Sequence, residues 1–330
     1  MLVLISIFCL MLLILFHELG HFISAKLFHI KVTDFSIGMG PAILKKTVGE
    51  TTYRLSALPL GGYVAIEGED GNKEDPRSLL NAAWWKQMIV FLAGITCNLV
   101  IGFLLLGILV FPYKYVILPT ITEIPTEITA AYGLEAGDKI LQIDSFNIYS
   151  VNDLAYAEAL DRDGKLTLSV YKPDSNYVHT YTVDRNPSLS IAYSAVFQSK
   201  EASFSDKLEM TKDTFLTISQ LTMESLKLLF SGQVSVQEMS GPIGIVDTAA
   251  SAASSYDFAY IMAFISINLG YMNLLPIPAL DGGQALICLL QAVTKREFNR
   301  KVLGYVNAAT MLLLLGLIMI VSVSDISKLF

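Results

Sequence analysis

The stretch LLILFHELGHFISAK, from Leu12 to Lys26, places two histidines and a glutamate at the end of an apolar block. Residues 1–16 carry no charged side chain. Ionisable groups inside a membrane-spanning helix are costly, and by default they indicate a functional site. The stretch therefore predicts a membrane helix over about residues 1–25 that carries chemistry within the membrane.

The rest of the chain has the same apolar character. Of its 330 residues, 53% are hydrophobic and only 16% are charged, whereas about 25% are charged in soluble domains. Three later segments carry no charged residue, and each is longer than the ~20 residues that cross a ~30 Å hydrocarbon layer: 87–113, 258–280 and 302–324. We therefore expect a multi-pass α-helical membrane protein with four transmembrane helices, over about residues 1–25, 87–112, 258–280 and 302–324.

The N-terminal block has no basic region before it and no small-x-small cleavage site after it, so it is interpreted as a retained helix rather than a signal sequence. The three cysteines, Cys9, Cys97 and Cys288, lie in apolar blocks and form no Cys-x-x-Cys pair, which argues against a disulfide framework or a cysteine metal site. The net charge of −7 and the lack of a long basic run indicate no nucleic-acid partner.

The distribution of lysine and arginine predicts the orientation. Eight basic residues lie between the first two predicted helices, and Lys295, Arg296, Arg300 and Lys301 lie between the last two. By the positive-inside rule these loops are cytoplasmic. Both termini and the segment from about 113 to 256 are then extracytoplasmic.

The outer segment begins with a domain-like region over residues 113–190. GLEAGDKILQID, from Gly133 to Asp144, is a glycine-bounded turn followed by an alternating strand. A helical stretch (VNDLAYAEAL) and two strand-like runs (KLTLSVYK and YVHTYTV) follow, separated by turn signals. This order resembles a PDZ domain, with a generic small β-domain as the alternative.

Residues 191–256 are expected to form an amphipathic connector. From Phe204 to Phe230, apolar residues recur at intervals of three and four, as in an amphipathic helix. Such a helix could lie on the membrane surface or pack against the preceding domain. On the cytoplasmic side, residues 30–70 are strand-like and unusually apolar, which favours a β-hairpin that re-enters the membrane beside a polar cavity.

His17, Glu18 and His21 form the H-E-x-x-H pattern. Residues four apart share one helix face, so both histidines can bind one zinc ion while Glu18 acts as general base. A catalytic zinc takes a third protein ligand. Asp281, at the predicted cytoplasmic end of the third helix, lies at a similar depth and is the best candidate. The alternatives are a polar cluster that joins helices or relays protons, and a helix N-cap role for Asp281.

Several phrases resemble the bacterial site-2 proteases, which are membrane-embedded zinc metalloproteases: HELGH, FSIGMGP, PLGGYVAIEGED, NLLPIPALDGG and SDISKLF. The nearest branch carries PDZ domains and regulates envelope-stress sigma factors, and this chain has room for one such domain. The resemblance implies that zinc is bound by His17, His21 and Asp281 and that Glu18 activates water. It also implies substrate-binding roles for Asn98, Asn268, Asn273, Gly61 and Gly62. The asparagines could instead join helices, and the glycines could simply form a turn.

These observations predict an intramembrane zinc endopeptidase of the bacterial plasma (inner) membrane, with its active site near the cytoplasmic face. The resemblance suggests that it cleaves single-pass proteins already trimmed by another protease, such as anti-sigma factors and remnant signal peptides. The alternative is a catalytically silent membrane scaffold bearing a PDZ-like domain. A zinc transporter is a third possibility, although the second and fourth predicted helices offer no His, Asp or Glu.

Overall fold

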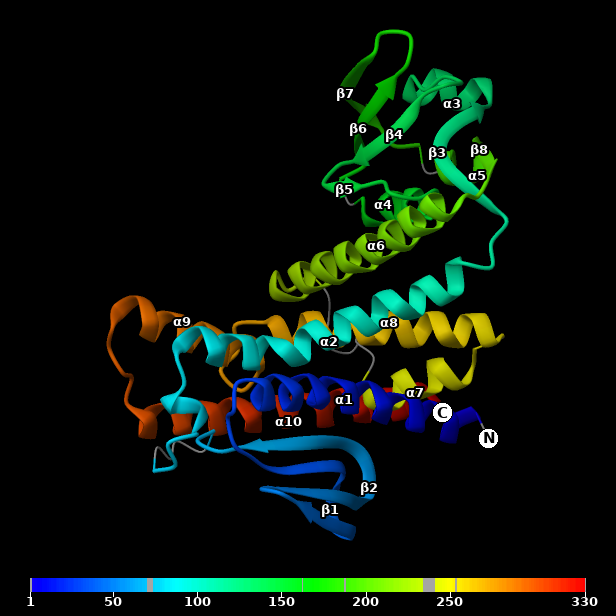
Figure 1. Cartoon of the computed structure of the whole chain (residues 1–330). Coiled ribbons are helices and arrows are strands. Elements are labelled where there is room, and N and C mark those ends of the chain that lie inside the picture. Colours follow the sequence, from blue (N-terminus) through cyan, green and yellow to red (C-terminus); the bar gives the residue numbers. More distant parts are fainter. Residues whose placement is uncertain are drawn as a thin grey trace. The chain divides into compact units, whose positions relative to one another are not determined.

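The computed structural model describes residues 2–69, 74–161, 163–186, 188–233, 241–252 and 254–329 (Figure 1). The chain forms two compact units. One comprises Met1–Leu105 and Leu226–Phe330, and the other comprises Leu106–Ser225.

The first unit consists mainly of long helices and one β-hairpin. Its elements are α1 (Leu2–Leu27), β1 (Val32–Val48), β2 (Thr51–Ile66), the short helix η1 (Leu79–Asn81), α2 (Trp84–Val110), α7 (Pro242–Ala250), α8 (Ser255–Leu274), α9 (Asp281–Thr294) and α10 (Arg300–Leu329). Helix α2 runs on into the second unit, and the first unit also contains the end of α6 (Phe204–Phe230).

Three helices of the described chain are long and apolar enough to cross a membrane: α1, α2 and residues Lys301–Lys328 of α10. Large apolar side chains are exposed on them, for example Leu312 and Met319 of α10 at 70% and 69%. Such surfaces are unfavourable in water and suit contact with lipid tails. The prediction of a membrane protein is confirmed at this level, and the chain is an integral membrane protein.

Helix α8 covers the third predicted span but is not among these three, because its asparagine, serine and tyrosine residues lower its apolar content. A fourth span therefore stays a prediction. The helix also ends at Leu274 instead of continuing to residue 280. Pro276 and Pro278 explain the difference, since proline has no backbone N–H and forces the preceding residue out of the helical conformation.

The predicted hairpin over residues 30–70 is present as β1 and β2, which pair in an antiparallel sheet. Both strands fold back on themselves. The first part of β1, residues 32–37, pairs with residues 62–66 of β2 on one side and with residues 52–55 on the other. The second part of β1 pairs with residues 51–56. Residues 62–66 therefore lie at an edge of the folded-back sheet.

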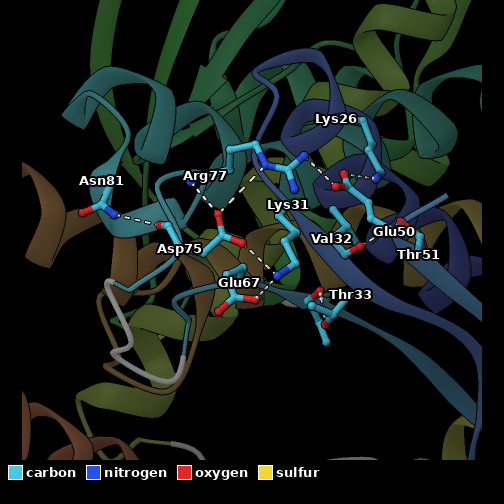
Figure 2. Close-up of polar contacts among 11 residues, drawn as sticks. Lys26, Lys31, Val32, Thr33, Glu50, Thr51, Glu67, Asp75, Arg77 and Asn81 are labelled. Carbon is cyan, nitrogen blue, oxygen red and sulfur yellow. Dashed lines mark hydrogen bonds and ion pairs between the residues drawn. The ribbon is translucent and has the colours of Figure 1, made fainter.

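A network of charged side chains joins the base of this sheet to the end of α1 and to the loop before α2 (Figure 2). Lys31 Nζ lies 2.8 Å from Asp75 Oδ2 and 3.1 Å from Glu67 Oε2. Backbone hydrogen bonds run alongside, from Lys31 N to Arg77 O and from Leu79 N to Glu67 O. The network also contains the ion pairs Lys26–Glu50, Arg77–Glu50 and Arg77–Asp75.

This network is expected to loosen in acid. Hydrogen bonds from Lys31 lower the pKa of Asp75, and Lys26 likewise lowers the pKa of Glu50. A carboxylate whose folded pKa is lowered stabilises the fold above its ordinary pKa of about 4, and that contribution is lost as pH falls through the folded value. At pH 7, Asp75→Asn should therefore speed hydrogen exchange at the amide of Lys31, and the difference from wild type should shrink toward pH 3.

The matched control is Asp184→Asn, which changes an exposed carboxylate of β7 in the second unit. It should leave hydrogen exchange at the hairpin unchanged. If the exchange rates of wild type and Asp75→Asn differed by the same factor from pH 7 to pH 3, the charge of Asp75 would not be what stabilises the hairpin.

Small residues bring the helices of the first unit close together. A Cβ added to Gly20 of α1 would overlap the backbone carbonyl of Ala93 in α2, and one added to Gly102 would overlap Ile267 of α8. Helices α1, α7 and α8 share an apolar core around Leu13. Helix α7 also contacts α10, where the buried carboxylate of Asp325 accepts a hydrogen bond from the N–H of Gly244 at 2.9 Å.

The second unit contains a mixed α/β fold. Its strands are β3 (Tyr115–Glu123), β4 (Lys139–Ile143), β5 (Phe146–Asn147), β6 (Lys165–Lys172), β7 (Tyr177–Asp184) and β8 (Val196–Glu201). They form a sheet in the order β7-β6-β4-β3-β8, with β5 paired to β4. Its helices, besides the first part of α6, are α3 (Thr126–Tyr132), α4 (Asn152–Leu160) and α5 (Ile191–Ser194).

The strands and helices predicted for residues 133–184 and for 204–230 are confirmed. The unit also extends past the expected domain end at residue 190, because β8 pairs with β3. Within it, Thr217 of α6 donates a hydrogen bond to the buried carboxylate of Asp153 in α4 at 2.8 Å. This part of α6 therefore packs on the domain instead of presenting a fully free face.

Candidate metal centre

Three potential metal ligands meet in the first unit. Nε2 of His17 lies 3.0 Å from Oδ2 of Asp281, and Nε2 of His21 lies 3.2 Å from the same oxygen. The two Nε2 atoms are 3.2 Å apart. Both histidines are buried, at 8% and 7% exposure. Residues separated by more than 250 positions in the sequence thus bring their ligand atoms to one point.

The partner of His21 determines which of its nitrogens can bind a metal. Its Nδ1 lies 2.7 Å from the backbone carbonyl of Val90 in α2. Since a carbonyl can only accept a hydrogen bond, Nδ1 carries the proton and the lone pair is on Nε2. Metal-binding histidines commonly have such a partner on the other nitrogen.

His17 has an equivalent partner in Asn98, which is fully buried. The side-chain amide of Asn98 lies 3.1 Å from Nδ1 of His17. The atom that faces Nδ1 is the amide nitrogen Nδ2, and Oδ1 of Asn98 is buried without a partner among the described residues. Amide oxygen and nitrogen are interchanged by a half-turn of the side-chain amide, and in that orientation the oxygen accepts the Nδ1 proton and leaves Nε2 of His17 free for a metal. The backbone carbonyl of Asn98 accepts a hydrogen bond from Ser266 of α8 at 2.8 Å, which fixes α2 beside α8.

The cluster fits a zinc ion. Two imidazole lone pairs and a carboxylate oxygen converge, and such a set of acceptors repels itself unless a cation or protons lie between them. A tetrahedral zinc with ligands at about 2.0–2.1 Å holds its ligand atoms roughly 3.3 Å apart, close to the separations observed here. Two histidines and one carboxylate also form a known set of catalytic zinc ligands.

Glu18 is held beside this cluster by the sheet. Its Oε2 accepts a hydrogen bond from the backbone N–H of Val64 in β2 at 3.0 Å. The bond uses one carboxylate oxygen and leaves Oε1 to take a proton. The edge residues 62–66 therefore position the candidate base, a contact that the sequence pattern did not indicate.

Gly94 is a site residue that the sequence reasoning missed. A Cβ at this position would overlap Nε2 of His21 and come within 2.7 Å of Cε1 of His17. Any side chain at residue 94 would therefore displace both imidazoles. Gly94 and Asn98 stand four residues apart in the phrase GITCN, and only Asn98 was predicted as a site residue.

Asp281 is the first residue of α9, where the partial positive charge of the helix N-terminus favours a carboxylate. Leu280, not Asp281, occupies the N-cap position, and no side-chain capping bond is formed. The two following glycines allow close packing: a Cβ on Gly282 would overlap Leu274 O, and one on Gly283 would overlap Ile277 O. Both glycines therefore help to present Asp281.

The other four residues predicted to bind substrate lie in two places, Gly61 and Gly62 in β2 and Asn268 and Asn273 in α8. Gly61 adopts a left-handed conformation (φ 81°), and a Cβ on Gly62 would lie 2.7 Å from Ser36 O, so both need glycine for backbone reasons. Asn268 donates a hydrogen bond to Phe264 O within its own helix. Asn273 lies half-buried near the end of α8. Substrate contact by these four residues stays a prediction.

Apolar helices that enclose two histidines, an aspartate and an adjacent glutamate define a membrane metalloprotease. Comparison with known proteins agrees: the sequence profile described as Peptidase family M50 matches residues 5–317. The chain belongs to this family, the site-2 protease family, and its cofactor is zinc.

Relatives from several bacteria match almost the full length of the chain, and each is described as a candidate zinc metalloprotease. One from Clostridium acetobutylicum is 34% identical over 321 residues, which cover 95% of this chain and 94% of the relative. One from Fusobacterium nucleatum is 33% identical and covers 99% of both chains. One from Clostridium perfringens is 32% identical and covers 95% of both.

Proposed function

We propose that this zinc metalloprotease is an intramembrane endopeptidase that cleaves the transmembrane segments of single-pass membrane proteins. The observation that carries the proposal is the convergence of Asp281 of α9 with His17 and His21, which lie together with Glu18 on α1, a helix long and apolar enough to cross a membrane. A proteolytic site in this setting meets segments that are themselves buried in the bilayer.

In this proposal each polar side chain has a defined role. His17, His21 and Asp281 hold the zinc, which, when bound, lowers the pKa of a water molecule and polarises a carbonyl group. Glu18 accepts a proton from the attacking water at Oε1 and passes it to the leaving amine. Asn98 and the carbonyl of Val90 keep the two imidazoles in the required protonation state.

The substrate must be unwound, because a helix shields its own peptide bonds. We propose that it extends along residues 62–66 of β2, at the edge of the folded-back sheet. Val64 there donates to Glu18, which brings this edge close to the base. Strand addition at a sheet edge is a common mode of peptide recognition.

The basic loops support an orientation in which the metal centre lies near the cytoplasmic face of the bacterial inner membrane, with both termini outside. The second unit would then be extracytoplasmic and PDZ-like. Substrates of this class would be pre-trimmed anti-sigma factors and remnant signal peptides, cleaved in regulated intramembrane proteolysis.

Glu18→Gln tests the proposal. It keeps the size of the side chain and the acceptor for Val64 but cannot take a proton at neutral pH. We expect about 10²–10⁴-fold slower cleavage of a single-pass test substrate in proteoliposomes, with zinc still at about one per chain by elemental analysis. Undiminished cleavage by this variant would show that the assignment of the base is wrong.

Two histidine variants serve as controls for the metal. His21→Ala should lose zinc and activity together. His29→Asn changes an exposed histidine whose left-handed conformation (φ 60°) asparagine tolerates, and it should retain both. A purified wild-type enzyme that holds zinc but cleaves no membrane substrate would favour the scaffold alternative.

A further inference from the structure

A cavity of about 580 Å³ adjoins the metal centre in the first unit. Asp281 lies on its wall, which also includes residues of α2, α9, α10, the short helix η1, the turn after β2 and the segments that precede α9 and α10. Its volume lies within the range of ~300–1,000 Å³ that is typical of ligand sites. A substrate segment next to the zinc ligands could therefore continue into it.

The cavity wall includes side-chain amides, and two of them, Gln87 and Gln284, already form hydrogen bonds within the protein. Gln87 donates to Ala82 O at 2.8 Å and lies 3.8 Å from the thiol of Cys288. Gln284 donates to Pro278 O. These amides hold the ends of α2 and α9 in place, so they have a structural role.

Asn307 of α10 differs from them. Its Oδ1 is buried and accepts no hydrogen bond from the residues that the structure describes. Asn307 lies seven residues after the start of α10, or about 10 Å along the helix at 1.5 Å per residue. A buried amide oxygen without a hydrogen-bond donor is unfavourable relative to a paired one.

An extended substrate would supply the missing donor. When a transmembrane helix is unwound, its backbone N–H groups lose their intrahelical acceptors, and within a membrane each needs a new one. The edge residues 62–66 can satisfy only one side of an extended chain. A segment that leaves the metal centre through the cavity would present further N–H groups to α10.

We propose that Asn307 is a substrate-binding residue whose Oδ1 accepts a backbone N–H of the unwound substrate in the cavity beside Asp281. This inference rests on the proposed function, since it needs an extended peptide at the metal centre. The occupant of the cavity is then the substrate chain a few residues from the cleaved bond, and α10 contributes directly to peptide binding.

The first test compares variants of Asn307 in the full-length, zinc-loaded enzyme. Asn307→Leu has a similar size but no acceptor, and we expect kcat/KM for a single-pass test substrate to fall about 10-fold. Asn307→Asp keeps an acceptor oxygen and should retain most of the activity. Zinc content should stay at about one per chain in both.

Thr310→Val is the matched control on the same helix. Thr310 lies outside the cavity wall, and its hydroxyl bonds to Val306 O within α10. This variant should cleave within about twofold of wild type, because it removes a polar group without removing an acceptor from the cavity. A drop in its activity equal to that of Asn307→Leu would overturn the assignment.

The second test replaces single amide bonds of the substrate with esters, which removes one N–H donor at a time. One ester position should lower wild-type kcat/KM about 10-fold, and the same ester should cost Asn307→Leu less than about twofold, because the hydrogen bond is already absent. An identical ester profile in both enzymes, or zinc loss in Asn307→Leu, would make Asn307 a structural residue and overturn the inference. Failure of the wild type to cleave the all-amide substrate would instead reject the proposed function itself.

Discussion

Gly94→Ala is expected to abolish zinc binding and, with it, proteolysis. The added methyl group would overlap Nε2 of His21 and lie 2.7 Å from Cε1 and 2.9 Å from Nδ1 of His17. Neither ring can simply rotate away, since His21 is bonded to Val90 O and His17 to Asn98. A displacement of about 1 Å at a catalytic group can cost ~10²-fold in rate, and here both ligands move together.

The measurement is zinc per chain by elemental analysis, combined with cleavage of the single-pass test substrate. We expect less than about one-tenth of the wild-type zinc, and an activity loss of at least about 100-fold. Gly107→Ala is the control on the same helix: its Cβ would make only an ordinary contact, 3.8 Å from Thr211. Because alanine favours a helix over glycine by about 1 kcal/mol, this control should be neutral or stabilising. Full zinc occupancy in Gly94→Ala would contradict the close approach of α2 to the histidines.

Gly283→Ala is expected to have the largest effect on stability. Its Cβ would overlap the carbonyl of Ile277 and lie 2.8 Å from Pro278 Cα, and both contacts are with backbone that cannot rotate away. Overpacking of this kind typically costs about 1–3 kcal/mol and sometimes more. Because Gly283 is two residues after Asp281, the strain should also displace the third zinc ligand.

Thermal unfolding in detergent and zinc content would reveal both consequences together. We expect a lower apparent Tm and partial loss of zinc, each larger than for the control Gly316→Ala. A Cβ on Gly316 of α10 would meet nothing within 4 Å among the described residues, so this control should be neutral or slightly stabilising. An unchanged Tm for Gly283→Ala would show that the segment 275–280 can rearrange freely.

The predicted helices that agree best with the structure are those with the strongest local signal. The spans expected over about 1–25, 87–112 and 302–324 correspond to α1, α2 and α10, with ends that differ by a few residues. Uninterrupted apolar runs need no tertiary information to form a helix in a membrane. The third span was expected to reach residue 280, where two prolines end it earlier at Leu274.

In the site, too, the features that depend on local sequence were predicted and those that depend on tertiary packing were not. His17 and His21 were predicted to share a helix face because four residues make about one turn, and their Nε2 atoms are 3.2 Å apart. Sequence spacing could not predict the contact of His21 with Val90 O or that of Glu18 with Val64 N. Backbone groups acquire these partners only when α2 and β2 pack against α1, and any residue type supplies the same carbonyl or N–H.

What the sequence by itself determined was the chemistry and its setting: two histidines, a glutamate and an aspartate among apolar helices, in an M50 peptidase. The tertiary structure brought the predicted ligand Asp281 to His17 and His21, and it alone decided that Gly94 leaves room for their rings and that Asn307, on a cavity wall, has an Oδ1 without a hydrogen-bond partner among the described residues. The reason is physical. Helical periodicity and apolar runs are local properties of a chain, whereas close approach depends on which small residues let distant helices touch.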